Sequence, residues 1–123
     1  MSSFKSLRSD TGEVVYFDDF VKRLAKPLPP KEHLNHMVMG VAGEAGELVD
    51  CIKKHTIYGK PLDHANLVEE LGDLLFYMQG ILNEFGIPWQ QVVNANVDKL
   101  YKRYHEGKYS DKQAQDRADK KGE

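Results

Sequence analysis

Two pairs of acidic residues have the types and spacing best suited to chemistry in this sequence. Glu44 and Glu47 are three residues apart, and so are Glu70 and Asp73. On a helix this spacing places Cβ atoms roughly 5–6 Å apart, so the two carboxylates of a pair can converge on one point. No lysine or arginine follows any of these acids at the fourth position. Like-charged carboxylates beside core residues oppose folding unless a cation compensates, and all-oxygen ligands favour Mg²⁺ or Mn²⁺ over zinc. The pattern therefore predicts a hard-metal site.

Four helical segments are expected to position these residues, because proline and glycine divide the chain at regular places. The expected helices span residues 15–26, 31–58, 64–85 and 88–105, with Asp63 as the N-cap of the third and Gly86 just after its end. No alternating strand pattern and no Asn-Gly or Asp-Gly hairpin signal is present, so no strand is expected. We predict a single all-α domain over 1–123, with an extension at 1–14 and a polar C-terminal segment at 106–123 that by composition alone is solvated or disordered.

The three long segments share one plan, an apolar stripe with a polar stripe beside it. In the last segment the expected core residues are Trp89, Val93, Val97, Leu100 and Tyr104. The polar stripe beside them carries an amide and two cations, which are Asn96, Lys99 and Arg103. Two helices thus offer paired acids, and a third offers donors that suit an anion.

Glycines interrupt the two acid-bearing helices. Each costs roughly 1 kcal/mol relative to alanine in a helix interior, which suggests that small size is needed there. Gly43 and Gly46 alternate with the acids in GEAGE, and Gly72 lies between Glu70 and Asp73, where close approach of helix backbones around a ligand would explain them. For Gly80, a helix crossing without any ligand stays open as the alternative.

Composition limits the other possibilities. The 123 residues carry 17 Lys and Arg against 19 Asp and Glu, for a net charge of −2, so no cationic surface for a nucleic-acid polymer is expected. No apolar run approaches the ~18 residues of a membrane span. A single cysteine, Cys51, cannot form an intrachain disulfide, and the first residues have no apolar signal-peptide core, so we expect a cytoplasmic protein.

Several motifs in order resemble the MazG-like, all-α nucleoside triphosphate pyrophosphohydrolases. The resemblance covers about residues 31–118 and rests on GEAGEL, YGKPLD, EELGDLL and N-x-x-K-x-x-x-R-Y. It implies that Mg²⁺, for which Mn²⁺ can substitute, is bound by the E-x-x-E and E-x-x-D acids. It also implies hydrolysis of a nucleoside triphosphate to the monophosphate and pyrophosphate, with broad activity on NTPs or dNTPs, including noncanonical ones.

The resemblance also implies roles for single residues. Asn96, Lys99 and Arg103 match phosphate-contacting positions, and Lys54 and Tyr77 match positions near the nucleotide. One carboxylate of the Glu44 and Glu47 pair is expected to orient or deprotonate the attacking water, since a general base must reach that proton. A homodimer or dimer of dimers is implied, in keeping with apolar faces that are too extensive for one small bundle. The C-terminal segment also resembles that of the family at Gly107, Lys108, Tyr109 and Arg117, which implies that it packs in part.

Two other functional classes are alternatives to this interpretation. A di-iron carboxylate bundle requires Glu-x-x-His on two helices, and that motif is absent from the sequence. A non-catalytic helical module that binds a nucleotide or a partner protein, with a structural divalent cation at the acids, stays open as the alternative.

Overall fold

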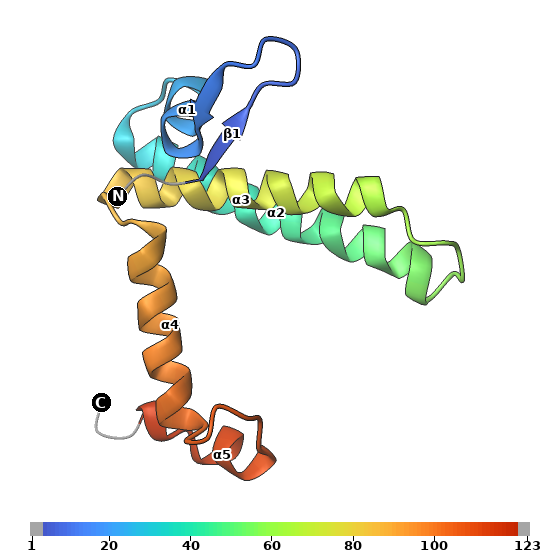
Figure 1. Ribbon diagram of the computed structural model, residues 1–123, viewed down its shortest axis with the longest axis vertical. Helices are drawn as coiled ribbons and strands as arrows, with labels where there is room; N and C mark the ends of the chain where they lie inside the picture. The colour runs from blue at the N-terminus through green and yellow to red at the C-terminus, as the bar shows by residue number, and fades with distance from the viewer. Residues whose placement is uncertain (1–3, 121–123) are drawn as a thin grey trace. The chain divides into compact units, whose positions relative to one another are not determined.

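The computed structural model describes residues 4–120, and the chain divides into two compact units, Met1–Gly86 and Ile87–Glu123 (Figure 1). The first unit contains β1 Lys5–Leu7, β2 Val14–Tyr16, α1 Phe17–Leu24, α2 Pro30–Thr56 and α3 His64–Phe85. The second contains α4 Trp89–Arg103, α5 Asp111–Asp116 and the 3₁₀ helix η1 Ala118–Lys120. The described part of the chain is therefore mostly helical, as predicted. None of its helices is long and apolar enough to cross a membrane.

The helix that carries Glu70 and Asp73 begins and ends where the sequence predicts. The Asp63 side chain accepts a hydrogen bond from the backbone N–H of Asn66 at 3.0 Å and so caps the start of α3. Gly86 follows the last residue with φ +63°, a left-handed conformation that favours glycine. The helix α2 begins at Pro30, whose fixed φ suits a first turn. Local sequence signals thus determine the bounds of both acid-bearing helices.

The core of the first unit lies where α2 and α3 run side by side (Figure 1). Met37 of α2 is fully buried and lies against Gly80 of α3, where an added Cβ would collide with the Met37 sulfur. Gly40 of α2 in the same way leaves room for the Tyr77 ring of α3. The helix-crossing explanation of Gly80 is confirmed, since its small size allows α2 and α3 to approach.

The short helix α1 is fixed on α3 by both apolar and polar contacts. Val21 is fully buried. The Asn83 side-chain amide donates to the backbone oxygen of Asp18 at 3.0 Å, and the Gln79 amide donates to Asn83 at 2.9 Å. Gln79 is itself buried, so this chain of hydrogen bonds satisfies polar groups that water does not reach.

The expectation that no segment forms a strand is wrong for residues 5–16. Here β1 and β2 form an antiparallel hairpin in which Ser6 pairs with Val15. The turn spans more than two residues: the Arg8 N–H donates to the Glu13 oxygen at 2.9 Å, and Gly12 has φ +73°. A two-residue hairpin signal does not find such a wide turn, and strands of three residues are too short to show alternation.

In the second unit, the middle of the expected core stripe of α4 is exposed, whereas Trp89 and Tyr104 at its two ends are half-buried. Val93, Val97 and Leu100 are 51, 45 and 37% accessible, because α4 packs here against the short elements α5 and η1. The polar segment beyond residue 106 packs in part, as expected, but composition did not predict its helices. Ser110 caps α5 by accepting the N–H of Gln113 at 3.3 Å.

Candidate functional site

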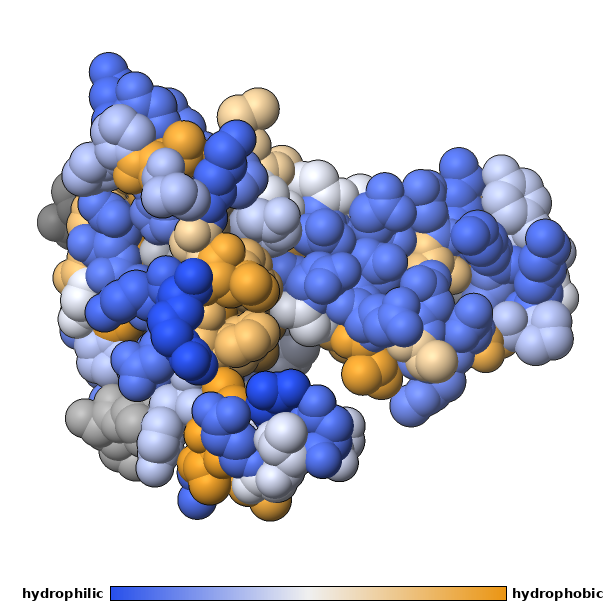
Figure 2. Space-filling model, turned by 90° about the horizontal axis from the view of Figure 1, so that it is seen from above, coloured by the Kyte–Doolittle hydropathy of each residue, from blue (hydrophilic) through white to orange (hydrophobic). Residues whose placement is uncertain are grey.

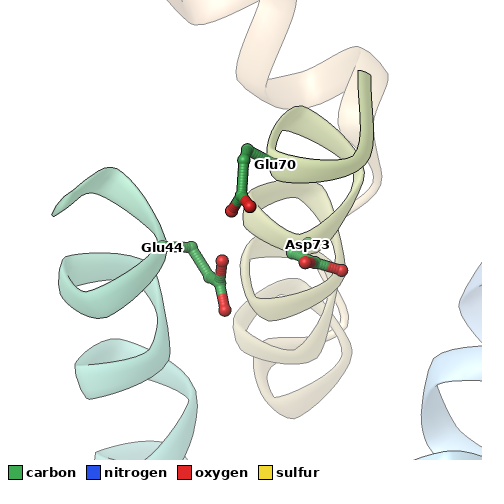
Figure 3. Close-up of side chains that lie close together, drawn as sticks. All are labelled: Glu44, Glu70 and Asp73. Carbon is green, nitrogen blue, oxygen red and sulfur yellow. The ribbon is translucent and has the colours of Figure 1, made fainter. Parts of the chain in front are cut away.

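The helices α2 and α3 bring three carboxylates together. Glu44 comes from α2, and Glu70 and Asp73 come from successive turns of α3 (Figure 3). One carboxylate oxygen of each residue lies within 4.8 Å of those of the other two. Figure 3 shows the Glu44 side chain extending from its helix toward α3. We call Glu44, Glu70 and Asp73 the acid cluster.

The acid cluster holds negative charge that the described residues do not neutralise. Between residues 4 and 120, no lysine, arginine or histidine forms an ion pair with any of its three members. Glu70 Oε2 is buried and has no hydrogen-bond partner in that part of the chain. Burial raises the pKa of Glu70, and the hydrogen bond and charge of Glu44 and the charges of Glu47 and Asp73 raise it further.

This arrangement fits a hard divalent cation. Its donors are all carboxylate oxygens, the ligands that Mg²⁺ and Mn²⁺ prefer, and the orphaned Glu70 oxygen is a group that a cation would satisfy. Glu44 and Glu70 are half-buried whereas Asp73 is exposed, so the cluster is accessible from solvent on one side. The cluster could therefore hold a metal ion that also contacts a ligand arriving from solvent.

In the second unit, the polar face of α4 ends in an ion pair with the C-terminal segment. Arg103 donates from Nε and Nη2 to the two carboxylate oxygens of Asp119, at 2.8 and 3.2 Å. The Arg103 side chain is 18% exposed and that of Asp119 is 1% exposed. This hydrogen bond lowers the pKa of Asp119 despite its burial, and the charges of Arg103 and Lys99 lower it further. Asn96 and Lys99 are exposed.

The MazG nucleotide pyrophosphohydrolase domain family matches residues 32–107 of this chain. The chain belongs to that family. The Gene 37 protein of Mycobacterium phage L5 is 32% identical to it over 82 residues, and the match covers 62% of this chain and 70% of the phage protein. No solved structure matches the chain. The family match includes the acid cluster and the polar face of α4, but neither the N-terminal hairpin nor Asp119.

Within the MazG domain, the four acids that the sequence singles out are not equivalent. Three of them form the acid cluster, whereas Glu47 is exposed and lies outside this group. Its charge nevertheless raises the pKa of Glu70, so it contributes to the same electrostatic environment. The spacing of each pair did not distinguish Glu47, because the difference depends on how α2 and α3 pack.

The two residues expected near the nucleotide differ in their surroundings. Lys54 is exposed in the last turn of α2. Tyr77 lies over Gly40, and its ring makes an edge contact with the ring of His36, with centroids 6.0 Å apart. Because Gly40 lies one turn before Glu44 and Tyr77 one turn after Asp73, this aromatic pair lies next to the acid cluster along the MazG helix pair.

Three glycines beside the acids face open space rather than a neighbouring helix backbone. No atom from elsewhere in the described chain comes within 4 Å of a Cβ built on Gly43, Gly46 or Gly72. The expectation that helix backbones approach one another at these positions is therefore wrong for residues 4–120. The glycines instead leave open space along the acid-bearing faces of the MazG domain.

Asp119 is the residue near a predicted site that sequence reasoning missed. It lies in a segment rich in charges of both signs, where no motif distinguishes one carboxylate from another. The pairing with Arg103 spans sixteen positions along the sequence and requires α5 to turn the chain back toward α4. Only the folded segment reveals this contact.

Proposed function

We propose that this MazG-family protein hydrolyses nucleoside triphosphates to the nucleoside monophosphate and pyrophosphate. The substrates are NTPs or dNTPs, with noncanonical ones included. The observation that carries the proposal is the convergence of Glu44, Glu70 and Asp73 from two helices in a chain of this family. Three carboxylates that form no ion pair with a lysine, arginine or histidine among residues 4–120 suit a metal ion shared with a polyanionic substrate.

Glu44, Glu47, Glu70 and Asp73 would hold Mg²⁺, or Mn²⁺ in its place. When bound, the ion supplies positive charge that offsets the charge developing on the phosphates. Within the Glu44 and Glu47 pair, Glu47 is better suited to orient the attacking water and accept its proton. It is exposed and lies outside the acid cluster, so its carboxylate is less occupied by ligation.

Residues of α4 are proposed to bind the phosphates. Lys99 and Arg103 supply cationic donors to the leaving pyrophosphate, Arg103 through its guanidinium fork, and Asn96 adds a neutral amide donor. Lys54 and Tyr77 are proposed to contact the nucleoside portion or the adjacent phosphate. Support for Tyr77 comes from its position one turn beyond Asp73, with its ring against that of His36.

A homodimer or a dimer of dimers, located in the cytoplasm, is part of this proposal. The exposed apolar residues of α4, together with exposed Met39 and Val49 of α2, are surfaces that a second copy would cover. Figure 2 shows apolar patches of this kind, in orange, interrupting an otherwise hydrophilic surface. Light scattering should give a mass of two or four chains, and a monomer at micromolar concentration would contradict the assembly.

A nucleotide panel tests the activity. Purified protein with Mg²⁺ should convert at least one NTP or dNTP to the monophosphate and pyrophosphate, both identified by ³¹P NMR, without release of orthophosphate. Glu47→Gln and Asp73→Asn should abolish turnover at unchanged helicity. Glu69→Gln is the matched control, because Glu69 is an exposed acid next to Glu70 on α3. Absence of turnover across all common NTPs and dNTPs would reject the enzyme and favour a non-catalytic nucleotide- or partner-binding module.

A further inference from the structure

Arg103, which the proposed function assigns to the substrate phosphates, forms an ion pair with Asp119 in the structure. The Arg103 guanidinium binds the Asp119 carboxylate through its side, because Nε and Nη2 each donate to a different carboxylate oxygen. A phosphate group with two oxygens presents the same acceptor pattern to a guanidinium fork. Asp119 therefore takes two of the five N–H donors of Arg103, on the side where Nε and Nη2 together could pair with a phosphate.

Lys99 takes part in the same electrostatic arrangement. It lies four residues before Arg103 on α4, so the two cations share one helix face. Its charge acts on the Asp119 carboxylate, as the lowered pKa of that group reflects. The charges of Arg103 and Lys99 therefore both stabilise the ionised form of Asp119.

The other described carboxylates of the C-terminal segment are engaged differently. Asp111 accepts a hydrogen bond from the Tyr109 hydroxyl at 2.6 Å, and Asp116 is exposed. Among residues 106–120, Asp119 forms the ion pair with α4. Its burial shows that the contact belongs to the folded segment rather than to a chance meeting of surface charges.

The connection that carries Asp119 to α4 is short and conformationally costly. Arg117, between α5 and η1, has φ +48°, a left-handed conformation that costs a non-glycine residue roughly 1–2 kcal/mol. Asp119 lies in the 3₁₀ helix η1, which is three residues long, and the buried hydrophobic residues of the described chain all belong to the first unit. The segment can therefore release Arg103 without loss of the buried core of the protein.

We propose that Asp119 is a tethered competitor of the substrate phosphates for Arg103. The inference rests on the proposed function for the identity of the anion, and it makes the C-terminal segment a regulator of that site's affinity. A phosphate must displace Asp119 before it pairs with Nε and Nη2 of Arg103. The apparent affinity for anions is then reduced by the fraction of molecules in which Arg103 is free.

Binding of inorganic pyrophosphate to the full chain, measured by calorimetry, tests this directly. Asp119→Asn removes the charge and keeps the shape, and it should tighten pyrophosphate binding by about tenfold, as expected if Arg103 is free in about a tenth of the molecules. Asp116→Asn is the matched control, an exposed acid in the same segment, and it should leave the affinity unchanged. Asp119→Glu keeps the carboxylate and should stay near the wild-type value. Unchanged or weaker binding by the Asp119→Asn variant overturns the inference.

Steady-state kinetics separate competition from a positioning role. If Asp119 competes with the substrate and leaves when the substrate binds, removing its charge should make binding easier. Asp119→Asn should therefore reduce KM and leave kcat unchanged. If Asp119 instead orients Arg103 for the reaction, the same variant should lower kcat, which would contradict the inference. Asp119→Ala provides a second neutral variant if the asparagine form does not fold, with far-ultraviolet circular dichroism as the check.

Failure of the proposed function has a separate signature. If no nucleotide is hydrolysed but Asp119→Asn still tightens pyrophosphate binding, the enzyme activity is rejected and the competition stands. If nucleotides are hydrolysed but neither pyrophosphate affinity nor KM responds to Asp119→Asn, the activity stands and the competition is rejected.

Discussion

Two groups of charged residues in this protein reach opposite solutions to the same electrostatic problem. The acid cluster of α2 and α3 gathers carboxylates without a cation among the described residues, and it leaves a buried Glu70 oxygen unpartnered. At the end of α4, in contrast, Arg103 and Asp119 satisfy each other through two hydrogen bonds. The charges of the second group are therefore paired within the described chain, whereas those of the first group are not.

The difference indicates where a ligand contributes stability and where it has to compete. A cation bound at the acid cluster would relieve repulsion that the folded chain cannot relieve by itself. An anion bound at α4 would have to replace a favourable internal partner. The pKa values have opposite directions for this reason, since that of Glu70 is raised and that of Asp119 is lowered.

The largest expected effect is on turnover when the acid cluster loses a charge. Glu70→Gln should reduce the rate of pyrophosphate release by more than about 100-fold, the upper end of what the loss of an outer-shell partner costs at a metal site. Rates with saturating Mg²⁺ and nucleotide measure it. Glu69→Gln, one position away and exposed, should stay near the wild-type rate. Equal rates for Glu70→Gln and wild type would remove Glu70 from the site.

The next effect concerns stability and the metal. Mg²⁺ at 100 times its Kd should stabilise the wild-type fold by about 2.7 kcal/mol, because it binds the folded state and not the unfolded one. Thermal unfolding with and without EDTA measures the difference. Glu44→Gln removes the α2 ligand of the acid cluster and should lose most of this stabilisation. A wild-type protein indifferent to Mg²⁺ would mean that the acid cluster does not bind the ion.

The pH dependence of the metal-free protein should separate the two groups. The raised pKa of Glu70 means that its contribution to stability is fully present below its ordinary value of 4.5 and is lost as the pH rises through the raised value. The lowered pKa of Asp119 means that its contribution is present above its ordinary value of 3.8 and is lost as the pH falls through the lowered value.

Urea unfolding at a series of pH values provides the measurement. Glu70→Gln should flatten the decline of stability above pH 4.5, and Asp119→Asn should flatten the decline on the acid side. The comparison fails if Glu70→Gln changes the acid side of the plot of unfolding free energy against pH, or if Asp119→Asn changes the side above pH 4.5. Because Mg²⁺ favours ionised carboxylates, its addition should remove the first effect and leave the second.

The smallest expected change tests the open space beside the acids. Gly72→Ala should stabilise the protein by up to about 1 kcal/mol, since alanine favours the helix and nothing lies within 4 Å of the added Cβ. Gly80→Ala is the matched opposite, because its Cβ would collide with Met37 and should destabilise by about 1–3 kcal/mol. Urea midpoints for both variants measure the difference. Destabilisation by Gly72→Ala would show that another surface covers this face in solution.

Elements governed by local signals were predictable, and those governed by longer-range contacts were not. Asp63 and Gly86 mark the ends of α3 because a cap and a left-handed residue act within one turn. The hairpin was missed because its turn spans several residues and its strands are short. The exposure of Val93 and Val97 was missed because periodicity identifies an apolar face of a helix but not what covers it.

The candidate site divides in the same way. By itself the sequence determined the helix bounds, the spacing of the acid pairs and the family motifs, because these depend on neighbours a few residues away. The packing of α2 on α3 decided that Glu44 joins Glu70 and Asp73 while Glu47 stays outside the group. The turn after α5 likewise decided that Asp119 pairs with Arg103. Such contacts depend on side chains distant in sequence, and only tertiary folding sets the distance between them.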